Sequence, residues 1–175
     1  QDLHNTGVIA KIIQTVRLQN NAKILVEAIH KVKLHNIVNN STFEAEYSLI
    51  NDEEVIDIET LRITTSNAIN LFMKYAKIHK KINPEIITTI TSEIDKDPTN
   101  FTYITNILAS YLTAPLLIKQ TLLEETKPQE RIKIIMDNLT SGMAQKDAEQ
   151  AVQQRAKQQI EKTQRDYYLN EQMKA

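Results

Sequence analysis

Cysteine and tryptophan are absent from this 175-residue chain, and glycine occurs only twice. Without cysteine there can be no disulfides and no thiolate metal sites, so we expect a reducing compartment, the cytoplasm. A phosphate-binding P-loop needs two glycines at a fixed spacing, followed by Lys and Ser or Thr. Neither Gly7 nor Gly142 lies in such a context, which excludes a Walker-type ATP site.

An excess of one charge is also missing. The 21 Lys and Arg residues face 22 Asp and Glu residues, which gives a net charge of −1. A chain without a basic stripe does not attract nucleic acid or an anionic membrane through its overall field. Apolar runs such as residues 114–118 fall far short of the roughly 20 residues that span a bilayer. We therefore expect a soluble globular chain with no membrane segment and no signal peptide.

The first part of the sequence shows a hydrophobic period of two, which is typical of half-buried strands. Asn20-Asn21 separates two such stretches, because asparagine tolerates the positive φ of a tight turn. Short turns of this kind favour an antiparallel, meander-like sheet with one buried face. The predicted strands are four, over about residues 8–18, 24–26, 31–37 and 43–49.

From Glu53 onward the period becomes 3.6, which is typical of amphipathic helices. Proline is favoured in the first turn of a helix, so the four prolines mark later helix starts. These helices are predicted to begin near Pro84, Pro98, Pro115 and Pro128. The fold class is therefore α+β, a small antiparallel sheet followed by a helical bundle. The predicted parts are a sheet subdomain (1–51), a helical bundle subdomain (52–143) and a C-terminal helical arm (144–175).

The last helix has two different halves. Up to Met143 it carries a full apolar face, but beyond Gly142 the apolar stripe becomes thin among Gln and charged residues. A continuous helix from Pro128 to Met173 would be roughly 65–70 Å long. A compact chain of this length is only about 40 Å across, so the arm should project and pair with a partner helix. The candidate assembly residues are Val152, Ala156, Ile160, Tyr167 and Tyr168.

No residue pattern indicates catalysis, a cofactor or a metal in this chain. The four histidines occur singly, and no serine lies in a recognisable strained turn beside a desolvated lysine. The acidic run Asp52-Glu53-Glu54 is interpreted as charge that either complements the dipole at a helix N-terminus or is simply solvated. Tyr167-Tyr168 either packs against a neighbouring module or contacts unfolded polypeptide, and Met136 and Met143 are either core or an adaptable binding surface.

Six segments, taken in order, resemble the N-terminal region of Lon-type ATP-dependent proteases. The C-terminal segment 162–175 resembles the junction at which that region meets the ATPase module. Ala28 and Asn83 depart from the family's pattern, which has glycine and proline at these places. The six segments are DLHNTGVIA (2–10), ILVEA (24–28), KKINPE (80–85), KQTLLE (119–124), ERI (130–132) and KTQRDYYLNEQMKA (162–175).

The resemblance implies a parent protein that is a hexameric, ATP-driven serine protease using ATP and Mg. Such a protease degrades misfolded and short-lived regulatory proteins. The chain would then be its substrate-recognition and assembly region, with an incomplete PUA-like β-domain. The chain opens without a Met, so we expect a fragment that starts after the family's first strands and stops before the ATPase and Ser–Lys protease domains.

Two other interpretations remain open. The first is a nucleic-acid-binding module, because the sheet resembles small RNA-binding barrels and some members of the family bind DNA. The balanced charge argues against it. The second is a structural spacer, in which the long helix sets the height of a substrate chamber. The expected partners are unfolded or misfolded proteins and further copies of the same chain.

Overall fold

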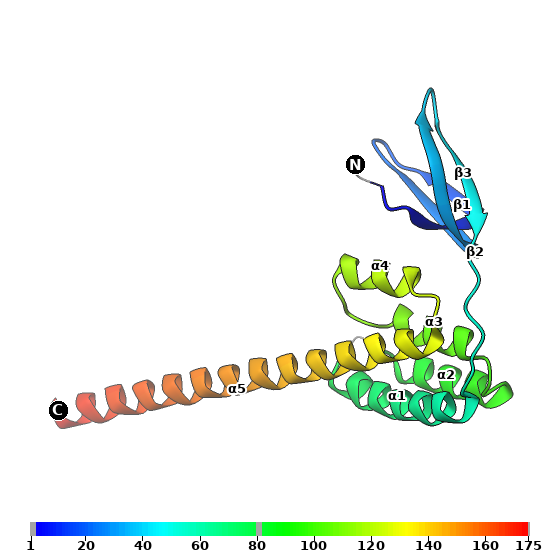
Figure 1. The fold of residues 1–175 in the computed structure, drawn as a ribbon. Helices are drawn as coiled ribbons and strands as arrows, with labels where there is room; N and C mark the ends of the chain where they lie inside the picture. Colours follow the sequence, from blue (N-terminus) through cyan, green and yellow to red (C-terminus); the bar gives the residue numbers. More distant parts are fainter. Residues whose placement is uncertain (1–2, 80–81, 175) are drawn as a thin grey trace.

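The computed structural model describes residues 3–79 and 82–174 (Figure 1). A small β-sheet lies at one side of a helical bundle, and a single long helix leaves the bundle and extends far beyond it. The order of elements confirms the predicted α+β class, with strands first and helices after them. The exact boundaries of the three predicted parts stay a prediction.

The sheet has three antiparallel strands in the order β1-β2-β3. The prediction of four strands was wrong, because its second and third strands form one 18-residue strand. The segment between them contains no Gly, Pro or Asn, so nothing in it favours a turn. Asn36 instead adopts a positive φ of 46° where the β2–β3 register shifts, between His35 and Val38. The strands are β1 (Thr6–Arg17), β2 (Ala22–Asn39) and β3 (Phe43–Leu49).

The sheet is in effect two hairpins that share β2. This strand pairs with β1 over Ala22–Lys33 and with β3 over Val32–Asn39, so the two pairings overlap only at Val32 and Lys33. Within the described residues, Val32 (3% exposed) is the one buried hydrophobic side chain of the sheet. The prediction that one face of the sheet is buried is therefore wrong for most of the sheet, because only the part around Val32 reaches the helices.

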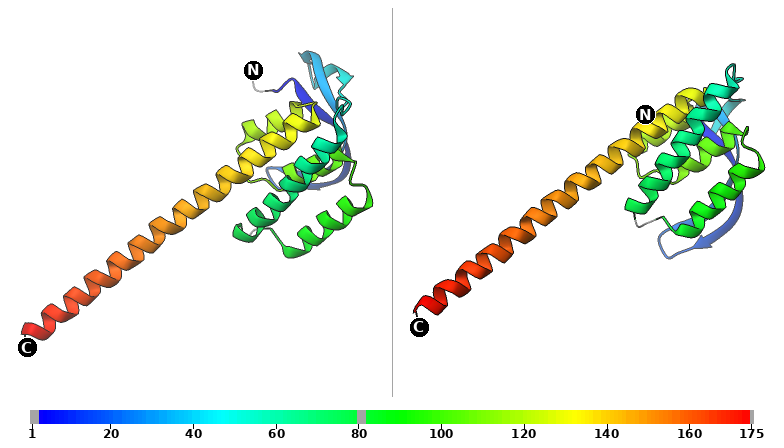
Figure 2. Two further views of the ribbon diagram at one scale, coloured as in Figure 1. Left: turned by 60° about the horizontal axis from the view of Figure 1, so that its bottom comes forward. Right: turned by 90° about the horizontal axis from the view of Figure 1, so that it is seen from below.

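The bundle is built from α1 to α4 and the first turns of α5 (Figures 1 and 2). Asp57, Asn83 and Asn100 cap the first three helices by accepting hydrogen bonds from backbone N–H groups two or three residues later. Pro84 and Pro128 begin helices as predicted, whereas α3 begins three residues after Pro98. The helices are α1 (Ile58–Ile78), α2 (Pro84–Lys96), α3 (Phe101–Ser110), α4 (Leu116–Glu124) and α5 (Pro128–Lys174).

Helix α5 is continuous over 47 residues and passes through Gly142 without a break. Its N-terminal part is buried against the bundle through Ile132, Ile135 and Leu139. Beyond Met143 it projects as the predicted arm, which we define as residues 144–174 (Figure 2). In the described ranges, no helix combines the length and hydrophobicity needed to cross a bilayer.

Candidate functional site

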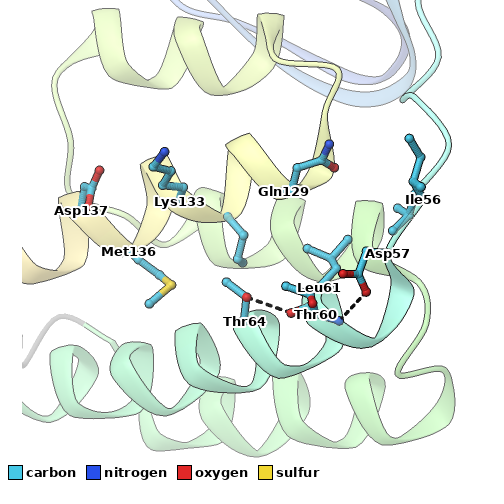
Figure 3. A pocket seen from close by; sticks show the side chains of 11 residues that line it. Ile56, Asp57, Thr60, Leu61, Thr64, Gln129, Lys133, Met136 and Asp137 are labelled. Atoms are coloured by element: carbon cyan, nitrogen blue, oxygen red, sulfur yellow. Dashed lines mark hydrogen bonds between the residues drawn. The ribbon is translucent and has the colours of Figure 1, made fainter.

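An apolar groove lies between the start of α1 and the start of α5 (Figure 3). Its volume is about 420 Å³, and most of its surface is carbon. The segment that enters α1 closes one end of the groove. The groove is lined by Val55, Ile56, Asp57, Thr60, Leu61, Thr64, Gln129, Ile132, Lys133, Met136 and Asp137.

The groove follows from how the two helices begin. The Asp57 carboxylate accepts a hydrogen bond from Thr60 N at 2.9 Å and so fixes the first turn of α1. This bond favours the ionised carboxylate and so lowers the pKa of Asp57. Leu61 and Ile132 are buried and form the floor, whereas Ile56 at the rim is fully exposed (100%).

The groove has few polar groups, and two of them are already hydrogen-bonded. Asp57 is already used as a helix cap, and the Thr64 hydroxyl donates to Thr60 O at 2.8 Å (Figure 3). The remaining polar side chains, such as Lys133 and Asp137, lie around an apolar floor. A cleft with apolar walls and a few polar groups at its rim holds a large apolar side chain mainly through the hydrophobic effect.

A buried ionic cluster lies close to the groove, at the joint between sheet and bundle. Asp52 accepts two hydrogen bonds from the Arg131 guanidinium, at 2.8 and 2.6 Å, and one from Thr102 Oγ1 at 2.6 Å. The ammonium of Lys31 also donates to Asp52, at 3.1 Å. Burial alone would raise the pKa of Asp52, but the bonds from Arg131, Thr102 and Lys31 outweigh it and lower the pKa to about 2.

This cluster corrects the interpretation of Asp52 as solvated charge. The Asp52 side chain is only 13% exposed, and Arg131 is almost completely buried. One signal in the sequence could have indicated it. Arg131 interrupts the apolar face of α5 next to Ile132 and Ile135, and a buried arginine requires an acidic partner.

The predicted assembly residues all lie on the exposed arm. Tyr167 and Tyr168 are 69% and 62% exposed, and Val152 and Ile160 are also more than half exposed. Tyr168 Oη accepts a hydrogen bond from Gln172 Nε2 at 2.9 Å within the same helix. Ala156 lies one turn from each of Val152 and Ile160. Their role in assembly stays a prediction.

The other candidate residues have structural surroundings. Met136 packs against the core and also lines the groove, whereas Met143 packs against the core. His79 stacks on Tyr75 with ring centroids 4.0 Å apart. His35 shares a hydrogen bond with Ser48 across β2 and β3. Within the described ranges, no group of three or more His, Asp or Glu residues is arranged to hold a metal ion.

Comparison with known proteins supplies the family. The sequence profile of the ATP-dependent protease La (LON) substrate-binding domain matches residues 1–141, which include every residue of the groove. A protein named Lon protease from Rickettsia felis is 55% identical over 175 residues, and one from Escherichia coli is 34% identical over 178 residues. Each alignment covers 99% of this chain but only 22% of the relative.

A solved structure agrees with the fold. The N-terminal domain of a Mycobacterium avium complex Lon protease superposes with a TM-score of 0.61 at 19% sequence identity. The superposition covers 80% of this chain and 73% of the solved one. At this identity the likeness supports the fold alone, and the sequence profile supports the family. The chain belongs to the family of Lon substrate-binding domains.

Proposed function

We propose that this chain is the substrate-recognition region of an ATP-dependent serine protease. The observation that carries the proposal is the match of residues 1–141 to a substrate-binding domain of that class of protease. The apolar groove supplies a surface of the right chemistry, because unfolded chains expose the large apolar side chains that folded proteins bury. Misfolded and short-lived regulatory proteins are the substrates we expect.

A single groove gives weak binding, which suits a protein that must pass its substrate onward. Burying one large apolar side chain contributes about 1.5–3 kcal/mol, less than the roughly 4 kcal/mol that corresponds to a millimolar Kd. Several copies acting on one unfolded chain would add affinity through effective concentration. The resemblance to Lon-type proteases implies a hexameric parent, which several-copy binding would suit, and the absence of cysteine favours the cytoplasm. ATP, Mg and the proteolytic serine would be supplied by segments other than this one.

Ile56 is the fully exposed apolar side chain of the groove. Replacing Ile56 with Asp removes the exposed apolar rim of the groove and should weaken binding of an unfolded polypeptide about tenfold, the value of one partly buried aliphatic side chain. Fluorescence anisotropy with a labelled, permanently unfolded protein measures this. The folded form of the same protein should bind hardly at all.

Ile63→Asp is the matched control, because Ile63 is an exposed isoleucine of α1 (52%) that does not line the groove. Its affinity for the unfolded protein should equal that of the wild type. Equal weakening by both variants would mean that general surface hydrophobicity, and not the groove, holds the substrate.

Charged residues on the arm test the assembly role. Val152→Glu together with Ile160→Glu should reduce self-association several-fold, because each places a charge in the apolar stripe of a solvent-exposed helix. Analytical ultracentrifugation over a concentration series measures this. Gln154→Glu together with Gln158→Glu adds the same two charges on the opposite side of the helix and should have no effect. Unchanged self-association of the double variant would leave the arm as a spacer that sets a distance.

The nucleic-acid interpretation gains no support from the structure. The exposed side chains of the sheet include many large apolar residues, whereas a nucleic-acid surface needs clustered Lys and Arg. Net charge of −1 also provides no electrostatic attraction for phosphates.

A further inference from the structure

The sheet and the bundle meet across a seam that is only partly filled. A cavity of about 650 Å³ lies between them, larger than the apolar groove. The sheet contributes Val8, Ile29 and Lys31 to its lining, and the helices contribute Leu122 and Arg131. A joint with this much open space is not packed like a domain core.

Few hydrogen bonds cross the seam within the described residues. Lys31 Nζ of β2 donates to Asp52 at 3.1 Å and to Glu125 O at 3.2 Å. Gln120 Nε2 of α4 donates to Thr6 O of β1 at 3.0 Å. Lys31 thus provides the one ion pair by which a described strand is bound to the rest of the molecule.

Asp52 belongs to the bundle side of this seam, although it follows directly after the sheet. Arg131 of α5 and Thr102 of α3 hold its carboxylate. The next residue, Glu53, donates its N–H to Thr126 O at 2.8 Å and accepts from the Thr126 hydroxyl. If Lys31 leaves, the Asp52 charge therefore keeps its arginine partner, and the ammonium group moves into water.

We propose that the Lys31–Asp52 ion pair holds the sheet in a docked position on the helical bundle, and that the sheet swings away when this pair opens. Residues 50 and 51, between the end of β3 and the anchored Asp52, are in neither a helix nor a strand, so they can act as the hinge. The movement would change the direction of the sheet relative to the arm while both parts stay folded.

Docking of the sheet is independent of substrate binding in the groove. Arg131 and Thr102 continue to hold Asp52 after Lys31 has left, so the segment that carries Ile56 keeps its place. A variant at Lys31 should therefore leave the affinity of the groove unchanged. An experiment can therefore contradict the proposed movement of the sheet without contradicting substrate binding in the groove, and the reverse.

Distance measurements between two spin labels test the hinge directly. The chain has no native cysteine, so Ser41→Cys near the β2–β3 turn and Asn67→Cys on α1 give one label on the sheet and one on the bundle. In the wild-type background we expect one dominant distance. Lys31→Gln should raise the ratio of released to docked molecules at least tenfold, because it removes the charge-assisted hydrogen bonds to Asp52 and to Glu125 O.

Lys33→Gln is the matched control, because Lys33 lies two residues further along β2 and is exposed. It should keep the wild-type distance distribution, and Lys31→Arg should largely restore it. A Lys31→Gln distribution that matches the wild type would overturn the proposal. Loss of helical circular dichroism in Lys31→Gln would also overturn it, because the bundle must stay folded when the sheet is released.

Discussion

Replacing Asp52 with Asn is expected to lower the free energy of unfolding by about 3–5 kcal/mol, the usual cost of leaving a buried charge without its partner. Arg131 is buried and has no other carboxylate on it among the described residues. The asparagine amide would turn a hydrogen-bond donor toward the guanidinium donors. Urea unfolding followed by circular dichroism measures the difference from the wild type.

Glu54→Gln is the control for that experiment, since Glu54 is an exposed carboxylate of the same segment. Its effect should stay within about 0.5 kcal/mol. The pH dependence gives a second test. The pKa of Asp52 is lowered from 3.8 to about 2, so its contribution is complete above pH 4 and is lost as the pH falls through about 2. The free energies of unfolding of the wild type and Asp52→Asn should converge there. A difference between them that stays constant down to pH 2 would contradict the ion pair.

Replacing Gly142 with Val should lower the free energy of unfolding by about 1–3 kcal/mol through overpacking. A Cβ at Gly142 would lie 2.9 Å from Tyr75 Cε2. The Tyr75 ring cannot move aside easily, because it is 1% exposed, stacks on His79 and accepts a hydrogen bond from Thr113 N through its hydroxyl. Thermal unfolding compared with the wild type measures the effect.

The neighbouring Ser141→Val places the same β-branched side chain in the same turn of α5, but at an exposed position. Its effect should be only the small loss of helix propensity, within about 0.5 kcal/mol. If both variants are equally stable, Gly142 does not serve the contact between α1 and α5.

The fold class could be predicted because periodicity is a local property. The change from period two to period 3.6 lies close to where β3 ends at Leu49 and α1 begins at Ile58. The continuous arm could be predicted for a similar reason, since no proline follows Pro128. The prediction of separate strands over 24–26 and 31–37 failed, because residues 27–30 contain no turn-forming residue and β2 continues through them.

The groove and the ionic cluster could not be predicted in this way, because both depend on contacts between distant parts of the chain. Asp52 and Arg131 are 79 positions apart, and Asp52 and Thr102 are 50 apart. The groove joins residues 55–64 to residues 129–137. Periodicity shows that a residue such as Met136 faces the bundle, but it does not show where two helices leave a gap between them.

Methyl-labelled NMR during a titration with an unfolded protein tests substrate recognition by the groove most directly. Isoleucine, leucine, valine and methionine methyl groups report on the groove, the sheet and the arm in one experiment. We predict that the signals of Ile56, Leu61, Ile132 and Met136 shift together, while those of Val152 and Ile160 on the arm do not. Binding that leaves the groove signals in place and shifts those of the sheet or the arm would contradict the account.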